Sequence, residues 1–242
     1  MNLKEFFRKT KDKVLDTIFP NDIKCILCDR DIPGNNQHIC EKCLKENIFN
    51  NGNRCVKCDM PIKEGNIVCD RCTQTHRSFE KCICPFIYDG KVRNAIIKLK
   101  DDKAKYLAKP FAKYIYEKLE KEDIQFDMIV PVPSHKKTIK RRGYNPAKVI
   151  ADELAVLSGK PICEALIKNV LSKNQKALGF QERQTNLQNT IVLTDKNLIK
   201  GKNVLLVDDI ITTCATIEVC STLLNKANKV YACAIARTML KD

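Results

Sequence analysis

Over the last two thirds of the chain, two kinds of apolar pattern follow one another in turn. From residue 81 to residue 242, short apolar runs alternate with segments in which apolar residues recur at helical spacing. The run Val204–Val207 is apolar at every position, as expected of a strand covered on both faces. Strands that alternate with helices are typical of a parallel or mostly parallel sheet with helices on both faces. We therefore expect an α/β domain over residues 81–242.

The expected strands and helices of this domain follow one another along the chain. Strands are predicted over residues 82–88, 126–132, 162–167, 190–193, 203–207 and 230–236. Helices are predicted over residues 92–99, 105–120, 146–157 and 215–225, and polar loops over residues 133–145 and 171–186. Sheets of this kind bind ligands beyond the carboxyl ends of their strands. Asp208 and Asp209 follow directly on such a strand end.

The pattern before residue 81 is different. Apolar residues at helical spacing over residues 2–19, followed by Pro20, predict an amphipathic helix, to which we assign residues 1–20. Residues 21–80 are rich in Asn, Lys and Cys and hold few apolar residues between the cysteines. Such a segment buries too little apolar surface to fold without cross-links or metal ions. We assign it to a second, small domain.

The placement of the cysteines indicates how this small domain is held together. The chain has 14 cysteines, and ten of them fall between Cys25 and Cys84. Two C-x2-C pairs can hold one Zn2+ in a closed tetrahedral site. Because the N-terminus shows no export signal, metal binding is favoured over disulfides. The sequence predicts a double zinc ribbon with two structural zinc ions, and its ligands are Cys25, Cys28, Cys40, Cys43, Cys55, Cys58, Cys69 and Cys72.

Two ways of combining the four C-x2-C pairs stay open. Sequential combination gives the first two pairs one ion and the last two pairs the other, whereas an interleaved arrangement exchanges the middle pairs. We prefer the sequential arrangement, because each half is then a self-contained ribbon. In both arrangements cysteines fill every position around the metal, so the predicted role of zinc is structural.

The chain is strongly basic. Its formal net charge of +14 falls to about +10 if eight thiolates bind two Zn2+ ions. A basic surface favours anionic partners such as nucleic acid, phosphorylated sugars or pyrophosphate. No apolar run approaches the ~20 residues that span a bilayer, so no membrane insertion is expected. The lack of a signal-peptide core predicts a cytoplasmic protein.

The order of residues 204–216 suits a sugar phosphate. An apolar strand ends in Asp208 and Asp209, and a Thr-rich stretch then opens a helix. The two carboxylates can accept hydrogen bonds from sugar hydroxyls, and a helix N-terminus can bind a phosphate. The residues expected at the phosphate are Thr212, Thr213, Cys214, Ala215 and Thr216.

Two further stretches carry cationic side chains suited to anions. After the predicted strand that ends at Val132, five cations lie within seven residues and a glycine closes the stretch. These residues are Lys136, Lys137, Lys140, Arg141, Arg142 and Gly143. The polar stretch 171–186 adds Lys173, Lys176 and Arg183.

Together these segments resemble known families. Residues 204–216 are similar to the phosphoribosyl pyrophosphate (PRPP) signature of type I phosphoribosyltransferases, in which Gly is more usual at the position of Cys214. The segments V-P-V-P at residues 130–133, R-G-Y-N at residues 142–145 and Q-x2-L-x4-R-x2-N at residues 175–186 resemble the ComF (ComFC) competence proteins. With the C-x2-C pairs and Ala236-Arg237-Thr238, the resemblance covers nearly the whole chain. It implies a parallel-sheet phosphoribosyltransferase fold behind a double zinc ribbon.

The resemblance also implies roles for the candidate residues. Asp208 and Asp209 would bind the 2′- and 3′-hydroxyls of the ribose, and residues 212–216 the 5′-phosphate. Residues 136–143 would bind the pyrophosphate of PRPP, which Mg2+ accompanies, and residues 171–186 would form a flexible loop over the ligand.

The implied function is that of a ComF-like protein. Such a protein binds PRPP and handles single-stranded DNA during DNA uptake in natural transformation, beside a helicase partner. Tyr144 is a candidate for stacking on a base. Two alternatives stay open, namely an active phosphoribosyltransferase with an unknown acceptor and a non-catalytic regulator that senses PRPP.

Overall fold

The computed structural model describes residues 24–32, 38–168 and 190–239. The chain divides into two compact units, Met1–Asn47 and Ile48–Asp242. The predicted N-terminal helix and the polar stretch 171–186 lie outside the described residues. Because the division falls after Asn47, the last two C-x2-C pairs belong to the same compact unit as the α/β domain.

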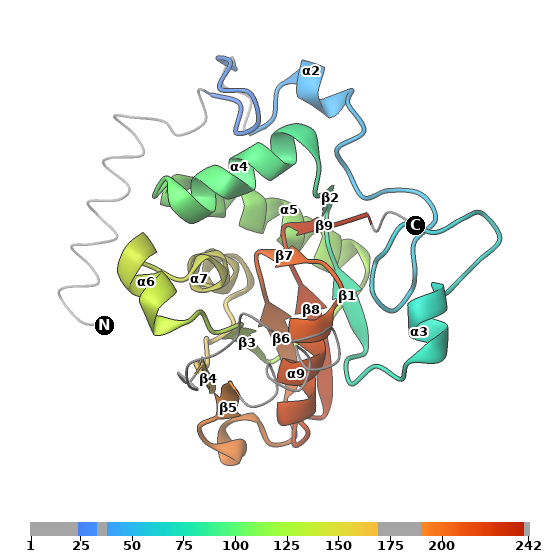
Figure 1. Cartoon of the computed structure of the whole chain (residues 1–242), viewed down its shortest axis with the longest axis vertical. Coiled ribbons are helices and arrows are strands. Elements are labelled where there is room, and N and C mark those ends of the chain that lie inside the picture. Colours follow the sequence, from blue (N-terminus) through green and yellow to red (C-terminus); the bar gives the residue numbers. More distant parts are fainter. Residues whose placement is uncertain (1–23, 33–37, 169–189, 240–242) are drawn as a thin grey trace, which may run out of the picture. The chain divides into compact units, whose positions relative to one another are not determined.

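A four-stranded parallel sheet forms the centre of the larger unit (Figure 1). Its strands are β1 (Lys81–Ile83), β3 (Met128–Pro131), β6 (Asn203–Val207) and β8 (Lys229–Cys233), in the order β1-β8-β6-β3. Residues 204–207 are buried because helices cover both faces of the sheet. The predicted α/β class with a parallel sheet is confirmed.

Three of these strands break and continue in a second, smaller sheet. Its strands are β2 (Phe86–Ile87), β7 (Ile210–Ile211) and β9 (Ala236–Arg237), all parallel, in the order β2-β9-β7. Pro85 lies between β1 and β2 and has no N–H for the ladder. The single strands predicted over residues 82–88 and 230–236 are therefore each two strands. Between β6 and β7 the break consists of Asp208 and Asp209.

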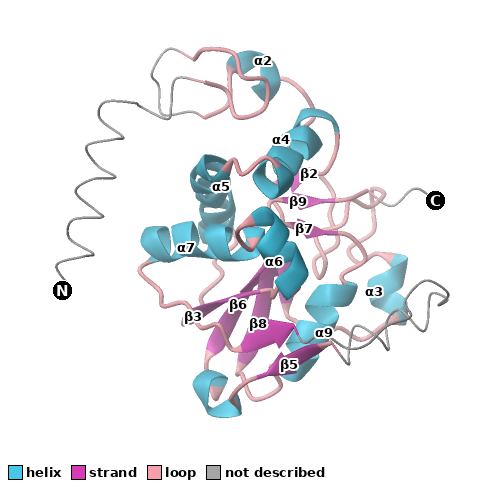
Figure 2. Ribbon diagram, turned by 60° about the vertical axis from the view of Figure 1, so that its left-hand side comes forward, coloured by secondary structure: helices cyan, strands magenta, loops and turns pink. Residues whose placement is uncertain are grey.

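Five longer helices belong to the larger unit. They are α4 (Gly90–Asp101), α5 (Ala108–Lys121), α6 (Lys136–Arg142), α7 (Pro146–Ser158) and α9 (Ala215–Leu223), with a 3-10 turn at Lys105–Leu107. Three of them, α4, α6 and α7, begin at a side-chain cap. The Asp89 carboxylate accepts a bond from the N–H of Gly90, and the Asn145 side chain accepts one from the N–H of Ala147. Figure 2 shows α7 and α9 on opposite faces of the main sheet. None of the described helices is both long enough and apolar enough to cross a membrane.

The cationic stretch after β3 is a helix rather than the predicted loop. Helix α6 begins after His135, whose Nδ1 accepts a hydrogen bond from the N–H of Lys137 at 3.1 Å. It ends at Gly143, which has a φ of 85°, a conformation that glycine adopts without steric cost. Lysine and arginine also have high helix propensity. Propensity and the two caps together explain why this stretch forms two helical turns.

The remaining strands of this unit lie outside the main sheet. Strands β4 (Leu166–Lys168) and β5 (Ile191–Leu193) form an antiparallel pair, followed by a 3-10 turn at Lys196–Ile199. The strand predicted over residues 162–167 is thus formed only at its end. Its beginning contributes one parallel bridge, between Ile162 and Ile129 of β3.

The last two C-x2-C pairs share their core with the sheet. Cys55, Cys58 and Met60 lie in one buried cluster with Val130 of β3 and Leu206 of β6. A short helix, α3 (Asp70–Gln74), follows Cys69. This half of the ribbon is therefore built into the α/β domain, which supplies the apolar surface that the ribbon lacks.

Asp59, directly after Cys58, anchors this half of the ribbon to helix α5. Its side chain is 2% exposed, and its carboxylate accepts hydrogen bonds from Arg54 Nη1 at 2.7 Å, Lys118 Nζ at 3.0 Å and the Cys84 N–H at 2.7 Å. Burial lowers the pKa of Lys118, and the charge of Asp59 offsets part of that effect. A buried carboxylate with three donors is well satisfied, and its loss would leave Lys118 without a counter-charge.

We expect Asp59→Asn to lower the free energy of unfolding by about 3–5 kcal/mol, because it leaves a buried lysine unpaired. The control is Asp152→Asn, which removes an exposed partner of Lys148 on α7 and should cost less than about 1 kcal/mol. Urea unfolding of the zinc-loaded variants measures both effects. Equal losses in the two variants would contradict the anchoring role of Asp59.

Candidate functional site

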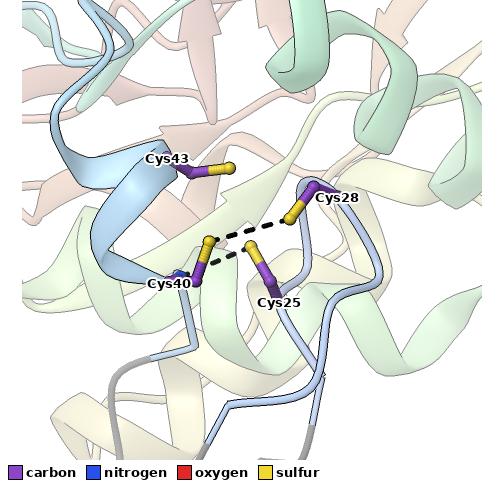
Figure 3. Close-up of side chains that lie close together, drawn as sticks. All are labelled: Cys25, Cys28, Cys40 and Cys43. Atoms are coloured by element: carbon purple, nitrogen blue, oxygen red, sulfur yellow. Dashed lines mark hydrogen bonds between the residues drawn. The ribbon is translucent and has the colours of Figure 1, made fainter.

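The first four predicted metal ligands lie together in the smaller unit (Figure 3). The thiols of Cys25, Cys28, Cys40 and Cys43 all lie within 4.8 Å of one another. The Sγ atoms of Cys28 and Cys40 are 3.7 Å apart, and the Cys40 N–H donates to Cys25 Sγ at 3.4 Å. Helix α2 (Glu41–Leu44) starts directly after Cys40 and places Cys43 toward the other three thiols.

The other four cysteines form a second cluster with the same local geometry. The thiols of Cys55, Cys58, Cys69 and Cys72 also lie within 4.8 Å of one another. In each cluster the first C-x2-C pair is followed by an aspartate with positive φ, Asp29 at 56° and Asp59 at 58°. The structure thus groups the cysteines sequentially and not in the interleaved way.

The spacing of the thiols fits tetrahedral zinc. With Zn–S bonds of about 2.3 Å, two sulfurs of a tetrahedral site lie about 3.8 Å apart. The separations of 3.7 Å between Cys28 and Cys40 and 3.6 Å between Cys58 and Cys69 agree with this value. A disulfide would require about 2.05 Å. Bound zinc would hold the two C-x2-C pairs of each cluster together. Because four cysteines fill its coordination positions, none would be left open for chemistry.

The two adjacent acids occupy the break between β6 and β7. The Asp208 N–H donates to the Cys233 carbonyl at 2.9 Å, and the Ile235 N–H donates to the Asp209 carbonyl at 3.2 Å. Asp209 pairs with Lys100 Nζ at 2.7 Å. Burial and the neighbouring charge of Asp209 raise the pKa of Asp208 from 3.8 to about 7. The pair therefore combines an ion-paired carboxylate with one that is poised near neutral pH.

The predicted phosphate residues form the turn into helix α9. Thr212 is exposed, Thr213, Ala215 and Thr216 are half-buried, and Cys214 is 3% exposed. Thr213 Oγ1 accepts a hydrogen bond from the Ala215 N–H at 3.4 Å. Cys214 has a φ of 66°, in the left-handed region where a side chain is strained and glycine is not. This explains in physical terms why glycine suits the position.

Helix α6 follows β3, which is the neighbour of β6 in the main sheet. Pro131 of β3 is in register with Val207 of β6, so the two segments leave the same edge from neighbouring strands. Lys136, Lys137, Lys140 and Arg141 are exposed, as is Gly143. Arg142 is half-buried and donates to Asp101 at 3.1 Å, to which Arg141 also approaches within 3.5 Å. The three lysines form no ion pair with any described residue.

The end of helix α4 connects the acids and the cations, which sequence analysis did not anticipate. Lys100 contacts Asp209, and the next residue, Asp101, contacts Arg142. The carbonyl of Leu99 accepts a hydrogen bond from the Tyr144 hydroxyl. Successive residues at one helix end thus hold both candidate segments. No local motif marks them, because the sequence does not show where a helix end will lie in the fold.

Tyr144 is not available for base stacking. Its side chain is 7% exposed, its hydroxyl bonds to Leu99, and Lys105 Nζ lies 4.7 Å from the ring centre. The role suggested for it by its position in a basic stretch is therefore wrong, because the ring closes the core beneath α6. The candidates Lys173, Lys176 and Arg183 lie outside the described residues.

The geometry of the cysteine clusters predicts about two zinc ions per chain, measured by elemental analysis of the purified protein. Cys28→Ser and Cys69→Ser each remove one partly exposed ligand, from the first and second cluster respectively. Each variant should retain about one tightly bound ion, because the other cluster stays intact. A content below two ions in the unaltered protein would contradict the double ribbon.

Two family models match the chain. The model described as "Phosphoribosyl transferase domain" matches residues 103–238, more than half of the chain, and that described as "Double zinc ribbon domain" matches residues 14–86. Among solved structures, adenine phosphoribosyltransferase is 18% identical and covers 58% of this chain and 84% of its own, with a TM-score of 0.37. A purine phosphoribosyltransferase from Pyrococcus horikoshii Ot3 is 20% identical over 52% of this chain and 70% of its own, with a TM-score of 0.32.

Curated relatives match along most of the chain. Competence protein F of Haemophilus influenzae is 26% identical over 212 residues, which are 85% of this chain and 92% of that protein. The DNA utilization protein YhgH of Escherichia coli K12 is 24% identical over 223 residues, which are 89% and 97% of the two chains. Both family models agree with the cysteine clusters and the parallel sheet described above. The chain therefore belongs to the phosphoribosyl transferase domain family, carries a double zinc ribbon ahead of that domain, and is a homologue of competence protein F.

Proposed function

We propose that this protein binds PRPP at the carboxyl edge of its main sheet and has a ComF-like role in DNA uptake. The observation that carries the proposal is the break between β6 and β7. The chain segments that follow β6 and β3 begin at the same edge of the sheet. They carry the two acids, the turn into α9 and the cations of α6. The names of the homologues, competence protein F and DNA utilization protein, support the DNA-related role.

The acid pair suits the ribose of PRPP. Carboxylates accept hydrogen bonds from vicinal hydroxyls, and consecutive residues beside a strand end direct their side chains differently. Asp209 is held by Lys100, so its carboxylate is already oriented when the ligand arrives. Asp208 accepts only the N–H of Asp209, at 2.8 Å, among the hydrogen bonds of the described residues. It therefore keeps lone pairs for a hydroxyl.

The turn into α9 suits the 5′-phosphate. The N–H groups at the start of a helix have no partner within the helix and carry partial positive charge. The hydroxyls of Thr212, Thr213 and Thr216 add donors around the same turn. Arg141, Arg142 and the lysines of α6 supply positive charge for the pyrophosphate.

Magnesium would arrive with the pyrophosphate rather than at a resident protein site. Among the described residues, the only groups of three or more potential metal ligands are the two cysteine clusters. Mg2+ keeps several waters and binds substrate phosphates through few protein carboxylates, which this arrangement satisfies. When bound, it would neutralise pyrophosphate charge, and the α6 cations would stabilise what remains.

A phosphoribosyl transfer reaction is the second candidate. It is favoured by the cations at the expected pyrophosphate end, because they would stabilise this leaving group as its bond to the ribosyl carbon breaks. An acceptor with a nucleophilic atom would then take the ribosyl carbon. Release of pyrophosphate from PRPP, with and without single-stranded DNA, distinguishes this reaction from binding or sensing alone.

Saturating Mg2+–PRPP should raise the thermal unfolding midpoint by about 5–10 °C when the ligand is near a hundred times its Kd. The variant Asp208→Asn/Asp209→Asn should lose this shift, because each amide offers one neutral acceptor oxygen in place of two charged ones. The matched control is Asp152→Asn/Glu153→Gln, an adjacent acid pair on α7, which should keep the shift. No shift in the unaltered protein would overturn the proposal.

The pH dependence of the same binding tests Asp208 separately. Its raised pKa of about 7 means that the carboxylate is largely neutral below that pH and ionised above it. Because the ionised form accepts hydroxyl hydrogen bonds better, affinity should rise as the pH increases through about 7. Asp208→Asn keeps the titration of the ligand phosphates but loses this rise. If the pH dependence of PRPP affinity were the same in Asp208→Asn and in the unaltered protein, the role of Asp208 would be contradicted.

Single-stranded DNA should bind through the exposed lysines of α6. The slope of log K against log salt is negative, and each phosphate contact contributes about −0.7 to it. The triple variant Lys136→Ala/Lys137→Ala/Lys140→Ala should therefore make the slope about two units less negative. The control is Lys196→Ala/Lys200→Ala/Lys202→Ala, the same loss of charge before the start of β6. Fluorescence anisotropy of a labelled oligonucleotide measures both. An equal change in the two variants would show that net charge alone decides binding.

A further inference from the structure

A buried arginine joins the second cysteine cluster to the candidate phosphate turn. Arg237 lies on β9 and is 1% exposed. Its guanidinium donates to the carbonyls of Ile211 at 2.9 Å and Thr212, which lead into the turn. It also donates to the Cys58 carbonyl at 3.0 Å and approaches Cys58 Sγ at 3.8 Å. Four of its five N–H groups therefore connect a metal ligand with the phosphate turn.

Cys214 forms a second connection from within the turn. Its thiol is buried, and the residue packs in the same buried cluster as Cys58 and Cys82. Glycine would relieve the strain of the left-handed backbone here but would lose this contact. When Cys58 binds zinc as a thiolate, the Cys214 thiol can donate to it. A residue unusual for the family signature thus places a thiol of the turn in the same buried cluster as the metal ligand Cys58.

Arg77 and Ser78 form a third connection, to the first turn of helix α9. Arg77 Nε donates to Cys72 Sγ at 3.4 Å, and its guanidinium lies 4.0 Å from the Glu218 carboxylate. The Ser78 N–H donates to Glu218 at 2.9 Å. Zinc bound to four thiolates carries a net charge of about −2, which Arg77 and Arg237 are placed to offset. Both sides of the phosphate turn are therefore fixed to the second cluster.

We propose that zinc in the second cluster positions the phosphate turn, so that metal occupancy and PRPP affinity are coupled, with Arg237 as the positioning residue. The inference rests on PRPP binding at this site and adds its regulation. Without zinc, Cys58 is no longer fixed, and the carbonyls of the turn lose the geometry that Arg237 imposes. By linkage, PRPP must then raise the zinc affinity of this cluster by the same factor. Because affinity differences appear mostly in the rate of dissociation, we expect the increase as slower loss of zinc. Couplings of this kind amount to about five- to hundredfold.

The first cluster offers an internal comparison. It belongs to the other compact unit, and the hydrogen bonds of its thiols described above join residues 25–40. It holds the same four ligand types with a similar spacing. We therefore expect no coupling between its zinc and PRPP. Cys28→Ser and Cys69→Ser are matched variants, because each removes one partly exposed thiol from one cluster.

The test measures zinc release from the full-length protein to the chromogenic chelator 4-(2-pyridylazo)resorcinol, with and without Mg2+–PRPP. We expect PRPP to slow release from one cluster at least about fivefold and to leave the other unchanged. The zinc ion whose release PRPP slows should still be bound in Cys28→Ser and should be absent from Cys69→Ser. Calorimetric titration should show weaker PRPP binding in Cys69→Ser and unaltered binding in Cys28→Ser.

Arg237→Lys tests the positioning residue itself, because lysine keeps the charge but cannot reach four acceptors. PRPP affinity should fall about tenfold at unchanged zinc content, and PRPP should no longer slow zinc release. Arg93→Lys, at an exposed position of α4, is the control. If Arg237→Lys does not fold, the release kinetics of the unaltered protein decide.

Two outcomes separate this inference from the function on which it rests. If PRPP raises the thermal midpoint but leaves both release rates unchanged, the coupling is refuted and PRPP binding stands. If PRPP raises neither the midpoint nor the zinc retention, the proposed function fails and the coupling fails with it.

Discussion

The buried guanidinium of Arg237 holds the second cysteine cluster and the candidate phosphate turn together through hydrogen bonds to both. One side chain, 1% exposed, satisfies carbonyls from the ribbon and from the turn after β7 while it remains part of strand β9. A guanidinium can do this because its donors have a fixed planar arrangement, and because the nearby thiols and carbonyls replace the water that a buried charge loses. The Arg237 guanidinium therefore fixes the chain segments around residues 58, 212 and 237 relative to one another.

A second buried side chain, that of Asp59, joins half of the ribbon to the α/β unit. The two cysteine clusters share their local geometry, including the left-handed aspartate after the first C-x2-C pair. They differ in what surrounds them. Asp29 is exposed, whereas Asp59 is buried and bonded to Lys118 and Arg54. The buried contacts of Asp59 with Lys118 and Arg54 therefore add to the shared apolar core in joining the second cluster to the domain.

Local signals in the sequence were sufficient for the fold class, the cysteine ligands and the position of the acid pair. Strand β6 has the predicted bounds because its apolar run ends abruptly at Asp208. Sequence patterns did not show that strands near Pro85 and Ala234 break into a second sheet, because each half is too short to have a period of its own. They also missed Lys100 and the bonding role of Arg237. Both act across the fold on segments more than 20 residues away, and their surroundings in the sequence are those of an ordinary helix end and a terminal strand.

We expect the acid pair, the phosphate turn and the second cluster to respond together to PRPP. Amide hydrogen exchange of the zinc-loaded protein, with and without Mg2+–PRPP, measures this segment by segment. We predict slower exchange over residues 208–216 and over residues 55–60, with no change over residues 38–45. Unchanged exchange over residues 208–216 at saturating PRPP would contradict it.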